Sequence, residues 1–143
     1  MIGHILVGVD GAEPSQHAAR FALDLAKQTS SRVTLLFVLE PPRLLPLGPL
    51  DSFVEIRGSD REHIEAGHRM LDDIAAAFSQ HQVRIDRLVE VGHAADTICD
   101  QAEKLGADLI VVGARGPRPG RWLLGSVSDR VVHHAKRAVA VVR

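Results

Sequence analysis

Five short apolar runs alternate along the chain with stretches in which apolar residues recur every three or four positions. Short apolar runs rich in β-branched residues predict strands, and the longer spacing predicts amphipathic helices. The predicted strands are residues 5–10, 33–39, 83–91, 109–112 and 139–142, and the predicted helices are residues 15–29, 60–81, 94–105 and 126–135. Alternating strands and helices favour a parallel sheet covered on both faces. Right-handed crossovers then give a doubly wound, five-stranded, Rossmann-like α/β fold, expected as one domain over residues 1–143.

Two segments depart from the simple pattern. Residues 83–91 alternate apolar and charged positions, which predicts a strand with one wetter face near an edge of the sheet. Residues 40–59 contain four prolines and two glycines, and we expect a long loop there. Loops of this length are uncommon in compact domains, and the segment is expected to be a lid, a surface for a partner, or disordered.

Composition narrows the classes of function. Seventeen basic and eighteen acidic residues give a formal charge of −1, which offers no electrostatic argument for nucleic acid or a membrane surface. No apolar run approaches the ~20 residues of a membrane helix, and the first residues lead into a strand and not a signal peptide. The single cysteine, Cys99, fits a reducing compartment. We therefore expect a cytoplasmic protein.

A candidate ligand site lies where two predicted strands end. In open parallel sheets, ligands bind beyond the carboxyl ends of the strands, where the strand order reverses. Asp10 ends the first strand, and a glycine-rich loop with Gly113 and Gly116 follows the fourth. Gly125 and Ser126 then begin the last long helix, and a helix N-terminus is a natural phosphate site. The alternative is an ordinary flexible loop followed by a serine N-cap, with Asp10 capping its own turn.

Other site chemistries fit the sequence less well. The eight histidines include no pair at metal-ligand spacing with a cysteine or carboxylate. Asp10 and Asp129 do not make the matched set of carboxylates that phosphoryl transfer requires, so we expect no dedicated enzyme and at most slow hydrolysis of a bound phosphate compound. A response-regulator receiver would need a phosphorylatable aspartate after the third strand, where the chain reads Val91-Gly92-His93.

The whole chain resembles the universal stress protein family. The opening HILVGVDGAEPSQHAARFALDLAKQTSSRVTLLFVLEPP is similar to the family's first β-α-β unit, and the closing GADLIVVGARG and LLGSVSDRVVHHAKRAVAVVR are similar to its last. The resemblance implies an adenine nucleotide alpha hydrolase-like fold, a stress-response role as sensor or regulator, and in many members ATP binding through Gly, two residues, Gly, nine residues and Gly-Ser or Gly-Thr. In this chain the gap between Gly116 and Gly125 is eight residues, one fewer than in the family pattern.

The resemblance also implies which residues hold the nucleotide. Val9, Asp10 and Val38 would line the nucleoside pocket. Gly113, Arg115 and Gly116 would contact the ribose and phosphates. The phosphates, with Mg²⁺, would lie at the start of the last helix, against Gly125, Ser126, Val127 and Ser128.

The last predicted strand favours a dimer. As an edge of the sheet, residues 139–142 would expose unpaired backbone groups, which the same strand of a second subunit could pair. The resemblance implies the same homodimer, and cover by a loop is the alternative. Two functions remain open: an ATP-binding stress regulator, and a nucleotide-free dimerising interaction protein that contacts an unknown partner through residues 43–53.

Overall fold

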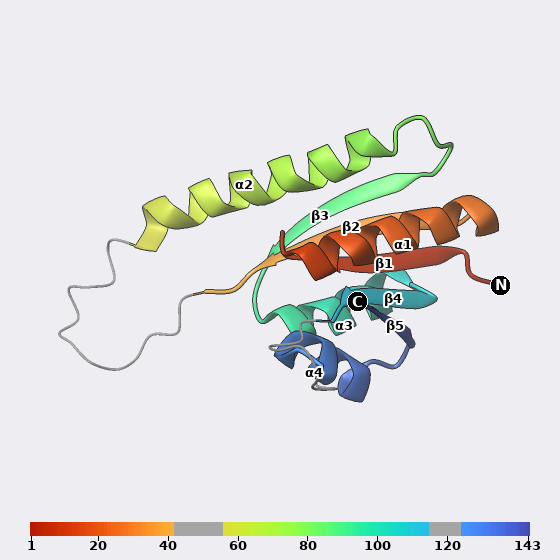
Figure 1. Cartoon of the computed structure of the whole chain (residues 1–143). Coiled ribbons are helices and arrows are strands. Elements are labelled where there is room, and N and C mark those ends of the chain that lie inside the picture. The colour runs from red at the N-terminus through yellow and green to blue at the C-terminus, as the bar shows by residue number, and fades with distance from the viewer. Residues whose placement is uncertain (42–55, 115–123) are drawn as a thin grey trace.

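Five parallel strands form one sheet between two layers of helices in the computed structural model, which describes residues 1–41, 56–114 and 124–143 (Figure 1). The strands are β1 (His4–Val9), β2 (Arg32–Leu39), β3 (Ile85–Val91), β4 (Leu109–Gly113) and β5 (Ala138–Val142). The helices are α1 (Glu13–Thr29), α2 (Ile56–Ala77), α3 (Ala94–Leu105) and α4 (Ser126–His134). The strand order is β3-β2-β1-β4-β5, and all four neighbouring pairs are parallel. The predicted doubly wound parallel sheet is therefore confirmed.

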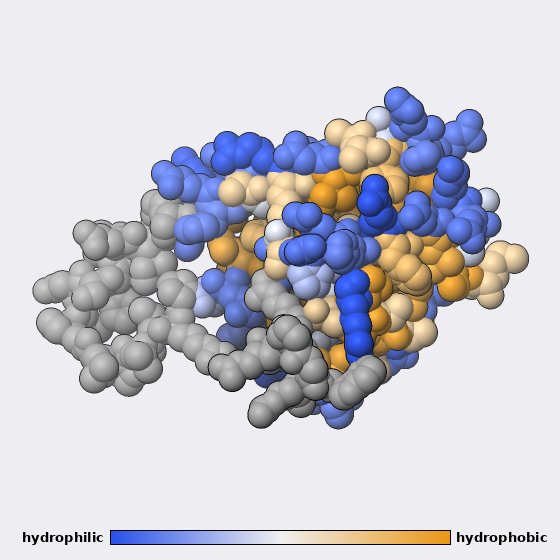
Figure 2. Space-filling view, viewed as in Figure 1, coloured by the Kyte–Doolittle hydropathy of each residue, from blue (hydrophilic) through white to orange (hydrophobic). Residues whose placement is uncertain are grey.

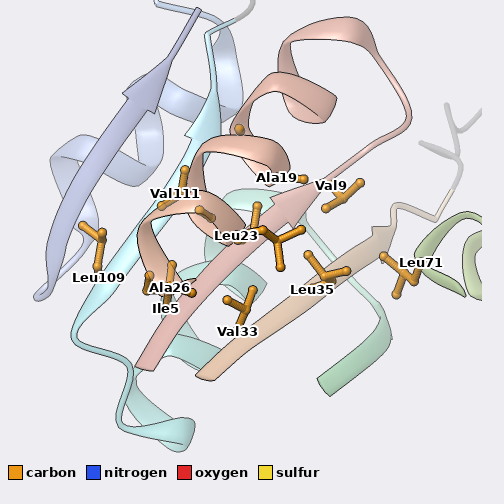
Figure 3. Close-up of a cluster of buried hydrophobic side chains, with 13 residues drawn as sticks. Ile5, Val9, Ala19, Leu23, Ala26, Val33, Leu35, Leu71, Leu109 and Val111 are labelled. Carbon is orange, nitrogen blue, oxygen red and sulfur yellow. The ribbon is translucent and has the colours of Figure 1, made fainter. Parts of the chain in front are cut away.

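Successive side chains of each strand enter two different cores. In β1, Ile5, Val7 and Val9 pack in the layer of α1 and α2, whereas Leu6 packs in the layer of α3 and α4. Figure 3 shows the first core, with Ile5 beside Ala26 and Val9 beside Ala19 of α1. Because both faces of the central strands are buried, their sequences are continuous apolar runs in which apolar and polar residues do not alternate.

The strand order reverses at β1, which is the central strand. The chain winds from β1 to β2 and β3 on one side, and then crosses to β4 and β5 on the other. The carboxyl ends of β1 and β4 are therefore adjacent, as the interpretation of the ligand site required. The same order leaves β3 and β5 at the two edges, where the sequence pattern predicted them.

The bounds of α2 differ from the predicted helix at both ends. The predicted loop 40–59 ends too late, because α2 already begins at Ile56. All four prolines of that segment lie at or before Pro49, so none of them obstructs this start. The predicted helix end at His81 is also wrong, because Phe78 and Ser79 donate to carbonyls three residues back, which tightens the chain into a turn after Ala77. The remainder of that predicted loop, residues 42–55, lies outside the described residues.

A buried histidine joins the first two strands. His4 is 3% exposed, its Nε2 lies 2.8 Å from the Thr34 hydroxyl, and its Nδ1 lies 3.3 Å from the Leu105 carbonyl oxygen. A carbonyl can only accept, so Nδ1 carries the proton of a neutral ring and Nε2 accepts from Thr34. Burial lowers the pKa of His4, and the nearby Arg32 charge lowers it further.

The free energy of unfolding is expected to fall as the pH is lowered from about 7 to 5. The unfolded chain, with an ordinary histidine pKa of about 6.5, takes up a proton in this range that folded His4 does not, so protonation favours unfolding. Urea unfolding at a series of pH values measures the effect. His4→Gln should flatten this part of the profile. His68→Gln, which replaces an exposed histidine of α2, is the control, and an unchanged profile in His4→Gln would contradict the assignment.

Candidate functional site

A cavity of about 90 Å³ lies at the carboxyl ends of β1, β2 and β4, where the winding reverses. One wall is apolar and consists of Leu36, Val38, Ile98 and Val112. The other wall carries backbone and polar groups from the ends of β1 and β4 and from the first turns of α1 and α4, namely Asp10, Ser15, Gly113, Gly125, Ser126 and Ser128. The cavity therefore suits a ligand with an apolar part and a hydrogen-bonding or anionic part.

Gly113 allows α1 to approach the end of β4. A Cβ atom at this position would lie 2.6 Å from the carbonyl oxygen of Pro14 and 2.7 Å from the Ser15 amide nitrogen. Both contacts are with backbone, which cannot rotate away as a side chain can. Because Gly113 has no side chain, the start of α1 can pack directly against the end of β4, beside the cavity.

Gly8 has the matching role on the opposite face of the sheet. A Cβ atom at Gly8 would lie 2.8 Å from Cδ1 of Ile98 in α3 and 3.5 Å from Cγ1 of Val112. A glycine within a strand commonly marks such a close approach. Gly8 therefore allows Ile98 to contact the sheet directly and to form part of the apolar wall.

Three helices begin around this cavity, and two of their N-termini already hold a carboxylate. The Asp10 carboxylate accepts the Ala12 N–H at 2.9 Å, where Ala12 is the N-cap of α1. The Glu40 carboxylate accepts the Ala94 N–H at 2.9 Å, at the first residue of α3. These anions compensate the partial positive charge at the start of each helix.

The N-terminus of α4 differs from the other two. Its N-cap is Gly125, which has no side chain to accept a hydrogen bond, and its first intrahelical bond runs from the Asp129 N–H to the Gly125 carbonyl at 2.8 Å. The N–H groups of Ser126, Val127 and Ser128 precede that bond, so they have no intrahelical acceptor. The Ser128 hydroxyl donates back to the Gly125 carbonyl at 3.0 Å, which holds the start of the helix in place. This end of α4 can therefore hold an anion.

Eight of the ten predicted site residues line the cavity together. They are Val9, Asp10, Val38, Gly113, Gly125, Ser126, Val127 and Ser128. The other two, Arg115 and Gly116, lie outside the described residues. The turn-capping contact that the sequence left open for Asp10 is present, because its carboxylate accepts the Ala12 N–H.

Sequence analysis missed several lining residues and one neighbour of the cavity. Ser15 accepts the Asp10 N–H at 3.2 Å and donates to the Ala12 carbonyl at 3.0 Å, so it holds the turn after β1. The signal that could have found Gly8 was a glycine within an otherwise apolar strand. Glu40 left no signal, because its contact with Ala94 spans 54 residues.

Within residues 1–41, 56–114 and 124–143, no group of three or more histidine, cysteine or acidic side chains is placed to hold a metal ion. In the same ranges, no helix has the length and apolar character needed to cross a membrane.

The fold and the position of the cavity define a doubly wound α/β protein with a site at the reversal of strand order. The universal stress protein family model matches residues 1–143, and the chain belongs to this family. Universal stress protein G of Escherichia coli O157:H7 is 36% identical over 137 residues, which cover 96% of this chain and 94% of that protein.

Solved structures share the fold. A universal stress protein in complex with cAMP has a TM-score of 0.74 at 23% identity, covering 99% of this chain and 97% of that one. A universal stress protein family protein from Arabidopsis thaliana with AMP bound has a TM-score of 0.68 at 20% identity, covering 98% and 90%. At such identities the likeness establishes the common architecture.

Proposed function

We propose that this chain binds ATP, with Mg²⁺ on the phosphates, in the cavity at the ends of β1 and β4, and acts as a stress-response sensor or regulator. The observation that carries the proposal is the start of α4, where three N–H groups without an intrahelical acceptor lie beside an apolar wall. A helix N-terminus attracts phosphate, and an apolar wall suits a purine base.

The two walls of the cavity determine how the nucleotide is oriented. The Asp10 and Glu40 carboxylates disfavour phosphates at the starts of α1 and α3, so the phosphates lie at α4. The base then lies against Val38 and Ile98. Arg115 and Gly116 complete the phosphate contacts, as the family resemblance implies. The cAMP- and AMP-bound relatives of the same fold support an adenine ligand.

The wider role follows from the same assignment. The chain forms a homodimer through β5, whose edge would pair with its copy, and works in the cytoplasm. Nucleotide binding changes the surface of the dimer that contacts a protein partner. Asp10 and Asp129 alone do not make a phosphoryl-transfer centre, so hydrolysis is slow or absent.

A nucleotide-free interaction protein is the second candidate. The specific observation in its favour is the cavity volume of about 90 Å³, which is below the ~300–1,000 Å³ usual for ligand sites. The short glycine spacing, with eight residues between Gly116 and Gly125, points the same way. In this alternative, residues 43–53 contact the partner.

Calorimetric titration of nucleotide-free protein distinguishes the two candidates. We expect saturable binding of ATP with Mg²⁺, weaker binding of ATP in EDTA, and a measurable affinity for AMP or cAMP through the shared adenine contacts. No heat with any of the three nucleotides, in protein shown to be folded by circular dichroism, would overturn the ATP proposal and favour the interaction protein.

A further inference from the structure

A second and larger cavity, of about 730 Å³, lies at the opposite end of the sheet. It is bounded by the end of α1, the start of β2 and the segment between α2 and β3, which lie together at the right-hand end of Figure 1. Its volume falls within the ~300–1,000 Å³ range of ligand sites, unlike that of the first cavity. Nothing in the proposed nucleotide site uses this end of the molecule.

Positive charge dominates the lining of this cavity. Lys27, Arg32 and Arg84 come from three separate segments, and no aspartate or glutamate is among the described lining residues. Ser30 and the side-chain amides of Gln80 and Gln82 add neutral donors. In Figure 2, hydrophilic residues crowd the upper right of the molecule, over the segment that joins α2 to β3.

The nearby acids engage little of this charge, and Lys27 also compensates the partial negative charge at the end of α1, because it lies in the last turn of that helix. Asp86 Oδ1 lies 3.7 Å from Nε of Arg84, and both side chains are too exposed for this pair to be strong. Asp108 accepts the N–H groups of Gly3 and His4, at 2.8 and 3.0 Å. Arg32 donates to the Leu105 carbonyl at 3.3 Å, which positions its guanidinium.

The end of α1 provides a second, independent observation. Ser30 caps this helix in the left-handed conformation, with φ of 56°. Most helices use glycine at such a position, and α3 in the same chain does so with Gly106, at φ of 64°. A serine there costs stability that glycine would not, and Ser30 is one of the residues that line the cavity. Such a residue is consistent with a ligand contact.

We propose that this second cavity binds a small polyanion carrying two or more phosphate groups. The guanidinium groups of Arg32 and Arg84 match phosphate oxygens in charge and geometry, and Lys27 adds a point charge. Because three cations line one cavity, a ligand with several linked anionic groups can contact more of them than a single anionic group can. The inference is independent of the nucleotide site.

Titration of the full chain with inorganic tripolyphosphate, followed by ¹H–¹⁵N spectra, tests the proposal. We expect saturable shifts of the amides at residues 30–32 and 80–84, separate from any shifts at residues 125–128. Lys27→Gln and Arg84→Gln should each weaken this binding about tenfold, the scale of one charge-assisted hydrogen bond. Arg61→Gln, which removes an exposed arginine near the start of α2, at the other end of that helix, should not change it.

The Ser30→Gly variant distinguishes a role of Ser30 in ligand binding from a role in stabilising the fold. This variant should raise the melting temperature, because glycine adopts the left-handed cap without strain, and it should weaken tripolyphosphate binding. Absence of saturable shifts at residues 30–32 and 80–84 would overturn the proposal. Equal weakening by Arg61→Gln would overturn it as well, because binding would then follow net charge alone.

Discussion

Replacing Gly113 with alanine is expected to destabilise the protein by about 3 kcal/mol, at the upper end of the cost of overpacking. The new methyl group would lie 2.6 Å from the Pro14 carbonyl oxygen and 2.7 Å from the Ser15 nitrogen. Because both contacts are with backbone, the start of α1 must move away from β4, and the cavity wall moves with it. For a chain of this size, the melting temperature should fall by roughly 10 °C, and ATP affinity should fall with it.

Gly3→Ala is the matched control for this prediction. Gly3 precedes β1, and a Cβ atom there would lie 3.5 Å from Oδ2 of Asp108, an ordinary van der Waals distance. We expect thermal unfolding of Gly3→Ala to stay close to that of the wild type. A melting temperature for Gly113→Ala equal to that of the control would show that the contact between β4 and α1 does not constrain the fold.

Gly125→Asp is expected to change stability and nucleotide affinity in opposite directions. The backbone at Gly125 has φ of −65° and ψ of 161°, which any residue can adopt. An aspartate N-cap would accept hydrogen bonds from the first turn of α4 and place a negative charge there, adding about 0.5 kcal/mol to the free energy of unfolding. The same carboxylate would compete with the phosphates, so ATP affinity should fall at least about tenfold.

Gly125→Asn is the control, because asparagine caps helices about as well and carries no charge. Urea unfolding and calorimetric titration of the two variants give both quantities. We expect the asparagine variant to gain less stability than the aspartate variant, because it lacks the charge, and to retain more of the affinity for ATP. An unchanged affinity in Gly125→Asp would mean that the phosphates do not lie at α4.

The sheet could be predicted because each of its strands and helices is recognisable from the sequence of its own segment. Each central strand is an apolar run long enough to identify by itself, and each helix has its own apolar stripe. The adjacency of Asp10 and Gly113 followed from one general rule about where ligands bind in parallel sheets. Sequence and general rules were therefore sufficient to predict that these two residues line one cavity.

The rest of the site depends on contacts between distant residues, which no local pattern reports. Gly8 matters because Ile98, 90 positions later, packs on it. Glu40 occupies the start of α3 through a bond that spans 54 residues. The basic cavity was missed for the same reason, because Lys27 and Arg84 are unremarkable surface charges until the fold brings them together.

The central position of β1 has a consequence for how the protein is made. β1 is completed by β4, and the Gly3–Asp108 bond beside that pairing joins residues 105 positions apart. Contacts of such separation form late, because a long loop must close first. During synthesis, β1, α1 and β2 emerge well before the strand and helix that finish the cavity. A nucleotide bound there would therefore be retained only by chains that have been translated past α4, and not by the nascent amino-terminal half.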